Sequence, residues 1–263
     1  MRFSGKIALV TGGSKGIGMA VARLFAQEGA SVAIVSLEDA SAVAEELCSG
    51  AGHERVIAVQ ADVSKHQQVQ AAVRQTTDAF GGIDILVNSA GIQRYGDVVE
   101  TDEALWDEVI DVNLKGMFLA SKNCIPEMRK RGGGAIVNVS SVQAYAAQSK
   151  VAAYAASKGG INALTRAMAV DHAAENIRVN VVCPGSVDTP MLRSAADLFK
   201  GQSTQEETIQ SWGRMHPIGR VGTTEEVAEL VAYLCSDKAG FITGADIKVD
   251  GGLFATFGVK LPD

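Results

Sequence analysis

Tyr154 and Lys158 stand four residues apart in a stretch whose apolar spacing predicts a helix over 152–175. Residues four apart on a helix share one face, so we expect the phenol and the ammonium to lie side by side. A free tyrosine has a pKa of about 10, which is too high for an efficient base near neutral pH. Lowering it by about 3 units takes about 4 kcal/mol of differential interaction, which a close and partly buried cation can supply. The pair therefore predicts general acid–base chemistry.

A third polar side chain is placed to join this pair. Ser141 lies thirteen residues before Tyr154 and directly follows an apolar run, 135–139. Its hydroxyl would then hydrogen-bond a substrate oxygen as negative charge develops there. Each residue also has a purely structural interpretation, because Tyr154 and Lys158 are compatible with an ordinary surface pair and Ser141 with a helix cap.

A glycine-rich segment, Thr11–Gly18, connects the first apolar run to a helix-like stretch. Glycines at a strand-to-helix turn let the backbone approach a pyrophosphate and leave amide N–H groups pointing at it. Tight turns also use glycine for steric reasons alone, so the motif by itself is weak. Its position between the first strand and the first helix favours dinucleotide binding.

The elements that must position these residues alternate along the chain. Short runs rich in β-branched residues predict strands at 7–10, 32–35, 56–59, 83–87, 135–139, 177–182 and 246–249. Nearly continuous hydrophobicity is typical of strands that are buried on both faces. Amphipathic stretches predict helices at 18–28, 67–79, 103–122, 152–175 and 205–212. This alternation predicts an α/β, Rossmann-like, doubly wound parallel sheet of about seven strands with helices on both faces, which binds ligands beyond the carboxyl ends of its strands.

Composition limits the protein class. The chain has 263 residues, 47% of them hydrophobic, and no linker divides it, so we expect a single domain over 1–263. A net charge of −6 disfavours general nucleic-acid binding. No apolar stretch is long enough to cross a membrane, and the first residues run directly into a strand pattern, so we expect a cytoplasmic protein without a signal peptide. The four cysteines and four histidines show no metal-ligand spacing, and we expect no metal.

Taken together, the motifs resemble those of the short-chain dehydrogenase/reductase family in its single-domain form, over essentially the whole chain. They are, in order, Thr11–Gly18, Asp62-Val63, Asn88-Ser89-Ala90-Gly91, Asn113, Ser140-Ser141, Tyr154-x-x-x-Lys158 and Pro184-Gly185 leading to Thr189. One departure is Ser89, which stands where the family usually has a second asparagine.

The resemblance implies a catalytic set of Asn113, Ser141, Tyr154 and Lys158. Tyr154 would be the general acid/base, Lys158 would also hold the nicotinamide ribose, and Asn113 would complete a proton relay. The implied cofactor is NAD(P)H, with contacts from Gly12, Ser14, Lys15, Gly16, Ile17, Gly18, Ser36, Glu38, Asp62, Val63, Asn88, Ala90, Gly91, Tyr154, Lys158, Pro184, Gly185, Val187 and Thr189. The resemblance also implies that residues 188–216 cover the substrate and that the protein is a homotetramer.

The choice between NAD and NADP depends on the end of the second strand. Ser36 ends that strand and leaves room for a 2′-phosphate, which Lys15 could pair with. Glu38 and Asp39 follow, and two anions against one cation disfavour a phosphate dianion. This balance slightly favours NAD. Alternatively, Glu38 and Asp39 only solvate a turn.

The candidate substrate-lining residues are Gln93, Arg94, Gln143, Gln148 and Trp212. The set is rich in hydrogen-bonding side chains, and a polar group that is buried without a partner costs about 1–3 kcal/mol. A small polar secondary alcohol or ketone such as a sugar, polyol or sugar acid would satisfy them, with Arg94 or Lys150 available for a carboxylate. The alternative is that several of these side chains point to solvent.

Two other functions stay open. A 3-oxoacyl-[acyl-carrier-protein] reductase would need a basic rim for its acidic carrier, and Arg129-Lys130-Arg131 offers one short basic cluster. That cluster is equally compatible with a solvated helix end. A non-catalytic dinucleotide sensor on the same fold would not need an acid–base pair, so the intact catalytic set speaks against it.

Overall fold

The fold, a computed structural model that describes residues 1–51 and 55–256, is built on one parallel sheet. Within the described residues the sheet has seven strands in the order β3-β2-β1-β4-β5-β6-β7. The strands are β1 (Ile7–Thr11), β2 (Ser31–Ser36), β3 (Val56–Gln60), β4 (Ile85–Asn88), β5 (Gly134–Val139), β6 (Ile177–Pro184) and β7 (Asp246–Val249). All seven predicted strands are present, and the predicted doubly wound sheet is confirmed.

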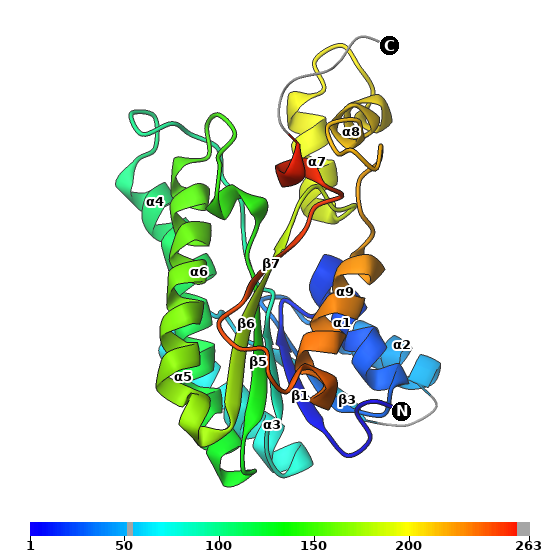
Figure 1. The fold of residues 1–263 in the computed structure, drawn as a ribbon, viewed down its shortest axis with the longest axis vertical. Helices are drawn as coiled ribbons and strands as arrows, with labels where there is room; N and C mark the ends of the chain where they lie inside the picture. The colour runs from blue at the N-terminus through cyan, green and yellow to red at the C-terminus, as the bar shows by residue number, and fades with distance from the viewer. Residues whose placement is uncertain (52–54, 257–263) are drawn as a thin grey trace.

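Helices cover both faces of the sheet (Figure 1). One layer contains α1 (Gly16–Gln27), α2 (Ser41–Ala51) and α9 (Thr224–Cys235). The other contains α3 (His66–Phe80), α4 (Glu103–Ile110), α5 (Gly116–Lys130) and α6 (Ala152–His172). Two further helices, α7 (Pro190–Phe199) and α8 (Gln205–Gly213), stand beyond the sheet at the upper end of Figure 1. In the described ranges, no helix is both long and apolar enough to span a membrane.

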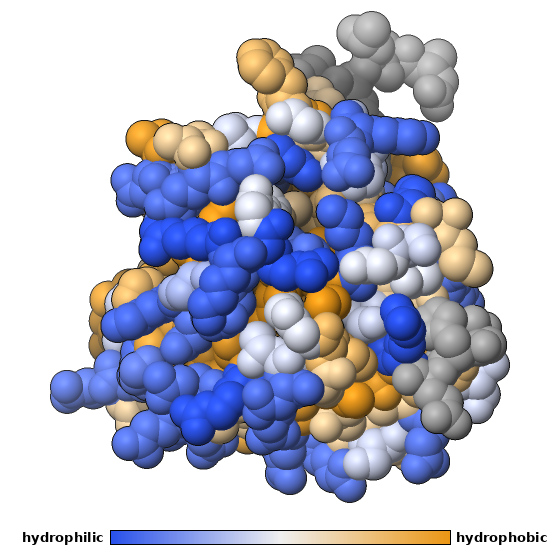
Figure 2. Space-filling model, turned by 90° about the horizontal axis from the view of Figure 1, so that it is seen from below, coloured by the Kyte–Doolittle hydropathy of each residue, from blue (hydrophilic) through white to orange (hydrophobic). Residues whose placement is uncertain are grey.

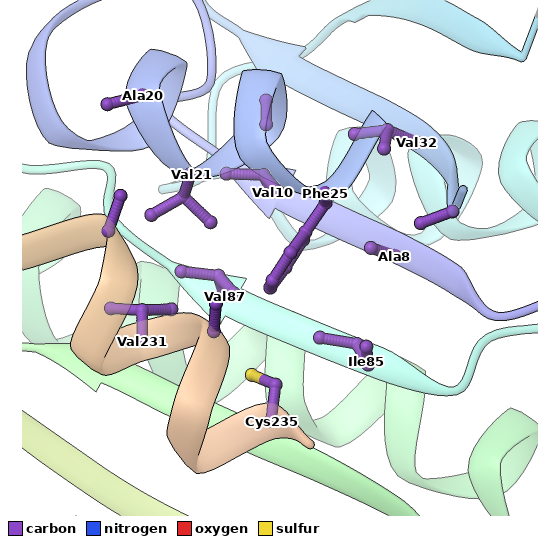
Figure 3. Packing of buried hydrophobic residues seen from close by; sticks show 14 of the residues in the cluster. Ala8, Val10, Ala20, Val21, Phe25, Val32, Ile85, Val87, Val231 and Cys235 are labelled. Atoms are coloured by element: carbon purple, nitrogen blue, oxygen red, sulfur yellow. The ribbon is translucent and has the colours of Figure 1, made fainter. Parts of the chain in front are cut away.

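The apolar strands fill two cores, one on each side of the sheet. Val10 and Val87 face the layer of α1 and α9, where Phe25 and Val231 pack against the sheet (Figure 3). Leu9 belongs to the opposite core, because successive side chains of a strand point to opposite faces. Every residue of β1, β2 and β4 is buried, which explains why these strands have no polar alternation.

The helix expected over 103–122 is interrupted. Between α4 and α5 the backbone makes a π-helical turn at Asp111–Lys115, and α5 then continues to Lys130. Such single turns insert one residue into a helix and are frequent at functional sites. Here the turn places Asn113 in the interior, with only 1% of its surface exposed.

Two helices of the α1 layer were not expected from the sequence. α9 begins with a capping box, in which Thr223 accepts a hydrogen bond from the Glu226 amide and the Glu226 carboxylate accepts one from the Thr223 amide. α2 begins after Asp39, whose carboxylate accepts hydrogen bonds from the amide and hydroxyl of Ser41. Asp39 therefore has a structural role at the start of α2.

Candidate active site

Most of the predicted nucleotide and chemical residues line one cleft of about 1360 Å³ at the carboxyl ends of the strands. α7 and α8 form its outer side. The predicted cofactor residues that line it are Gly12, Ser14, Lys15, Gly16, Ile17, Ser36, Glu38, Asp62, Val63, Ala90, Gly91, Tyr154, Lys158, Pro184, Gly185, Val187 and Thr189. The parallel sheet therefore brings together motifs that are dispersed over most of the chain.

Two glycines of the first turn are required by close backbone packing. A Cβ on Gly12, whose φ is +66°, would lie 2.8 Å from backbone atoms of Ala90. A Cβ on Gly18 would lie only 2.2 Å from the Gly12 carbonyl oxygen. Gly18 itself does not line the cleft, so its contribution is to pack the turn against α1.

Asn88 also lies behind the cleft wall rather than in it. Its side-chain amide donates to the side-chain oxygen of Asn138 at 2.9 Å and to the hydroxyl of Ser121 at 3.3 Å. Asn138 in turn donates to the Thr165 hydroxyl on α6. This buried polar chain joins β4, β5, α5 and α6 directly beneath the site.

An ion pair lies where the second strand meets the glycine turn. Lys15 Nζ and Glu38 Oε2 are 2.5 Å apart, and the ammonium holds the pKa of the Glu38 carboxyl below its usual range. Beside them, the hydroxyls of Ser14 and Ser36 are hydrogen-bonded at 2.9 Å. Glu38 thus neutralises the cation that would otherwise attract a 2′-phosphate.

The predicted acid–base residues are adjacent and buried. Tyr154 and Lys158 project from one face of α6, and Lys158 Nζ lies 5.3 Å from the centre of the Tyr154 ring. Their exposed fractions are 7% and 5%. Lys158 Nζ donates to the Val139 carbonyl oxygen at 3.1 Å, and the Ser141 hydroxyl favours the ionised form of the Tyr154 phenol. β5 and the turn after it therefore hold both groups.

Burial dominates the protonation of this pair. It raises the pKa of Tyr154 to about 12, an effect that the Ser141 hydroxyl partly offsets. It also lowers the pKa of Lys158 to about 8. Burial therefore has the largest effect on the Tyr154 phenol in this structure, and the lowering of its pKa by Lys158 stays a prediction.

Asn113 connects the strand side of the cleft to α6. Its side-chain amide donates to the Ile92 carbonyl oxygen at 2.9 Å and to the Ser157 hydroxyl at 3.1 Å, while its side-chain oxygen accepts from the Ile92 amide at 2.8 Å. Ser157 donates to the Tyr154 carbonyl oxygen. Asn113 does not itself line the cleft, and its part in a proton relay stays a prediction.

All five predicted substrate residues, Gln93, Arg94, Gln143, Gln148 and Trp212, line the cleft. The expected carboxylate partners are nevertheless occupied. Arg94 donates two hydrogen bonds to Glu108, at 3.0 and 2.7 Å, and Lys150 pairs with Glu100 away from the cleft wall. The expectation of a free cation for a substrate carboxylate is therefore wrong for both residues.

The substrate end is also more apolar than the sequence suggested. Its wall includes Tyr95, Leu192, Phe199, Met215 and Phe254. One polar group is poorly satisfied there, because the side-chain oxygen of Gln143 is buried and has no hydrogen-bond partner among the described residues. The wall therefore combines an apolar surface with amide groups.

The segment 188–216, expected as a substrate cover, is built from α7 and α8. Arg193 pairs with Asp188 near its start, at 2.7 and 2.6 Å. At its end His216 is buried and its Nδ1 lies 2.6 Å from the Asp250 carbonyl oxygen. His216 therefore packs the cover onto the C-terminal turn, and it does not line the cleft.

The basic cluster lies at the opposite end of the molecule. Arg129, Lys130 and Arg131 end α5 just before β5 begins, whereas the cleft lies beyond the strand ends (Figure 1). Each is paired with an acidic residue: Glu175, Glu127 and Asp84 respectively. Hydrophilic side chains cover much of that lower face (Figure 2). Of the two interpretations of this cluster, the structure agrees with the solvated helix end and not with a docking rim beside the cleft.

The chain has extensive similarity to known oxidoreductases. The family model described as enoyl-(acyl carrier protein) reductase matches residues 12–254. The chain is 39% identical to 2-(S)-hydroxypropyl-CoM dehydrogenase 3 of Xanthobacter autotrophicus, over 97% of this chain and 98% of that one. It is 40% identical to the 3-oxoacyl-[acyl-carrier-protein] reductase FabG of Thermotoga maritima, over 96% and 99%. The solved structure of Thermoplasma acidophilum aldohexose dehydrogenase superposes with a TM-score of 0.90 at 38% identity, covering 99% and 98%.

The burial of Lys158 couples the stability of the fold to pH. Its pKa falls from 10.5 to about 8, so between these values the unfolded chain binds more protons and stability rises with pH. Relative to a Lys158→Met variant, the wild-type free energy of unfolding should increase by about 3 kcal/mol between about pH 7 and about pH 11. Urea unfolding of both proteins across this range measures the difference.

The matched control is Lys200→Met, an exposed lysine paired with Asp197, which should reproduce the wild-type profile. A wild-type minus Lys158→Met difference that stays flat over the same range would contradict the coupling.

Proposed function

The chain belongs to the short-chain dehydrogenase/reductase family of oxidoreductases, which act on CH–OH and C=O groups, and on that premise we propose that it transfers a hydride between NAD(H) and a secondary alcohol or ketone. The observation that carries this proposal is the shared cleft. Ser141, Tyr154 and Lys158 line the same cavity as the glycine turn that begins at Gly12.

The residues present fit a dinucleotide. Gly12 and Gly18 keep the turn free of Cβ atoms where the backbone is closest. At the start of α1, no side chain of the described residues caps the free amides, so these N–H groups and the helix dipole are available to a pyrophosphate. The nicotinamide, when bound, supplies the hydride acceptor for oxidation or the hydride donor for reduction.

The chain's own residues supply the proton chemistry. In the reducing direction Tyr154, protonated at neutral pH, donates its proton to the substrate oxygen while Ser141 hydrogen-bonds that oxygen. In the oxidising direction the phenolate form of Tyr154 accepts the hydroxyl proton. Lys158, still mostly protonated near pH 7, stabilises the phenolate electrostatically.

For the substrate we propose a small, uncharged, hydroxylated molecule with an apolar face, such as a sugar or polyol. The amides of Gln93, Gln143 and Gln148 support hydroxyl recognition, and the Tyr95 and Phe199 rings support an apolar face. The similarity to an aldohexose dehydrogenase supports the same class.

A reductase of 3-oxoacyl chains is the second candidate. The FabG relative and the apolar side chains at the substrate end favour it. The basic residues Arg129, Lys130 and Arg131 lie at the far end of α5 and are all paired, which leaves this candidate without its expected carrier contact. A dinucleotide sensor without catalysis is disfavoured by the complete set of buried acid–base groups.

Replacing Tyr154 by Phe should reduce turnover at least a hundredfold, because general acid–base catalysis supplies about 10²–10⁴-fold. The dissociation constant for NAD⁺ or NADH should stay near the wild-type value. Steady-state kinetics and cofactor fluorescence titration measure the two effects. Tyr233→Phe, on the exposed side of α9, is the control. Turnover near the wild-type level in Tyr154→Phe would refute the assigned role.

We expect the wild-type enzyme to prefer NAD⁺ over NADP⁺. Glu38→Gln removes one carboxylate charge and frees Lys15, so the ratio of kcat/KM for NADP⁺ over NAD⁺ should rise about tenfold. Adding Lys15→Met to that variant should cancel most of the gain. Glu46→Gln, which breaks an exposed pair with Arg23 outside the cleft, should leave the ratio unchanged. A wild-type preference for NADP⁺ would reverse the assignment.

A substrate screen tests the proposed class. We expect kcat/KM for neutral sugars and polyols to exceed that for sugar acids at least about tenfold, because Arg94 is already paired with Glu108 and a buried carboxylate would lack a partner. The screen should include 3-oxoacyl thioesters and hydrophobic ketones. A kcat/KM for either of these groups that is tenfold higher than for neutral sugars and polyols would contradict the proposed substrate class. The hydride-transfer proposal would be unaffected.

We further propose that the enzyme is a homotetramer, in line with the family resemblance. Large apolar side chains that are exposed on the single chain support subunit contacts, among them Trp106, Phe118, Val170 and Phe241. Sedimentation equilibrium should return four times the chain mass of 27.5 kDa. A monomer at micromolar concentration would contradict the proposal.

A further inference from the structure

One aromatic contact crosses the substrate end of the cleft. Tyr95, in the segment after β4, packs edge-on against Phe199, the last residue of α7. The ring centres are 4.7 Å apart and the ring planes meet at 82°. Both residues line the cleft, so their contact joins the cover to the opposite wall at the substrate end.

The backbone next to Tyr95 is anchored to the residues that precede α6. The amide of the next residue, Gly96, donates to the Lys150 carbonyl oxygen at 2.8 Å, and Gly96 forms a parallel bridge with Val151. Lys150 adopts a φ of +60°, a conformation that side-chain-bearing residues rarely take and that persists only where the surroundings hold it. Lys150 also pairs with Glu100, in the same segment as Tyr95.

This anchoring fixes Tyr95 relative to the reacting groups. Val151 immediately precedes α6, the helix that carries Tyr154. Burial raises the pKa of Tyr95, and ionisation of Tyr95 would raise the pKa of Tyr154, so the two phenols lie close enough to interact. The Tyr95 ring therefore forms a fixed part of the cleft wall on the side of α6.

Phe199 belongs to the cover and lies at the C-terminal end of α7. α7 is capped at its start by Thr189, whose hydroxyl accepts from the Leu192 amide, and Phe199 stands at the far end of the helix. The neighbouring Leu198 is 61% exposed and does not line the cleft. A substrate too large for the closed cleft would have to separate Phe199 from Tyr95.

We propose that Tyr95 and Phe199 are specificity-determining residues, which together limit the substrate to a single ring or a short chain at the reacting carbon. This inference rests on the proposed function in that the reacting group is a secondary alcohol or ketone. The selection acts by size: small substrates fit behind the closed pair, and larger ones lose the ring contact when they bind.

The kinetic test compares a single-ring secondary alcohol, cyclohexanol, with a larger one, 4-phenylcyclohexanol, using NAD⁺. Phe199→Ala and Tyr95→Ala should each raise the ratio of kcat/KM for the larger over the smaller alcohol about tenfold. The double variant should gain no more than either single variant, because both remove one shared contact. An unchanged ratio, or a double effect equal to the product of the single effects, would overturn the proposal.

Two further variants separate size selection from other roles. Tyr95→Phe keeps the ring and should retain the wild-type ratio, so a changed ratio would assign the selection to the hydroxyl and overturn a size limit. Leu198→Ala, the exposed neighbour on the same helix, should also retain the wild-type ratio.

A measurement without substrate makes the outcome independent of the proposed function. Amide hydrogen exchange within 190–199 should become faster in Phe199→Ala and Tyr95→Ala than in wild type and Tyr95→Phe, because the ring contact holds the end of α7. Equal exchange in all four proteins would overturn the proposal. Inactivity of the wild type toward every alcohol would refute the proposed function. The amide hydrogen exchange rates would still show whether the Tyr95–Phe199 contact holds the end of α7.

Discussion

The burial of a lysine ammonium beside a tyrosine is the constraint on which the active site depends. Water no longer solvates Lys158, so the Val139 carbonyl at the end of β5 must hydrogen-bond its charge. The same burial opposes ionisation of Tyr154, and the Ser141 hydroxyl after the same strand offsets part of that effect. One strand end therefore supports both members of the pair, and any shift of β5 against α6 would disturb proton transfer.

Most of the sheet could be predicted from the sequence because strands buried on two faces leave uninterrupted apolar runs. Two helices, α2 and α9, lie outside the helical stretches predicted from the sequence, although each has a local signal at its start. The Thr223 and Glu226 capping box marks the start of α9, and Asp39, interpreted as an anion opposing a 2′-phosphate or as a solvated turn residue, lies just before α2 and bonds its first residue. The interruption between α4 and α5 could not be predicted from the sequence. A π turn inserts one extra residue into a helix, and tertiary packing, here around the buried Asn113, determines where that happens.

The parts of the site that depend on residue type and on position after a strand were predictable. The parts that depend on contacts with residues far away in the sequence were not. Glycines and acid–base residues follow strand ends, so their meeting in one cleft could be expected. Whether a cation is free depends on carboxylates elsewhere in the chain, which the sequence does not pair: Arg94 meets Glu108, and Lys15 meets Glu38. The pKa of Tyr154 could not be predicted for a related reason. The spacing places a cation beside the phenol, but it does not show how far burial removes the two groups from water.

The close approach of Gly12 to Ala90 has a consequence for biosynthesis. Thr11 accepts a hydrogen bond from the Ser89 amide, 78 residues later in the chain, and β1 lies between β2 and β4. A chain emerging from the ribosome therefore carries the whole glycine motif long before the wall against which it packs. Nucleotide binding can stabilise only chains in which β4 has already paired with β1. An N-terminal fragment that ends before β4 would therefore contain the glycine motif but lack the nucleotide site.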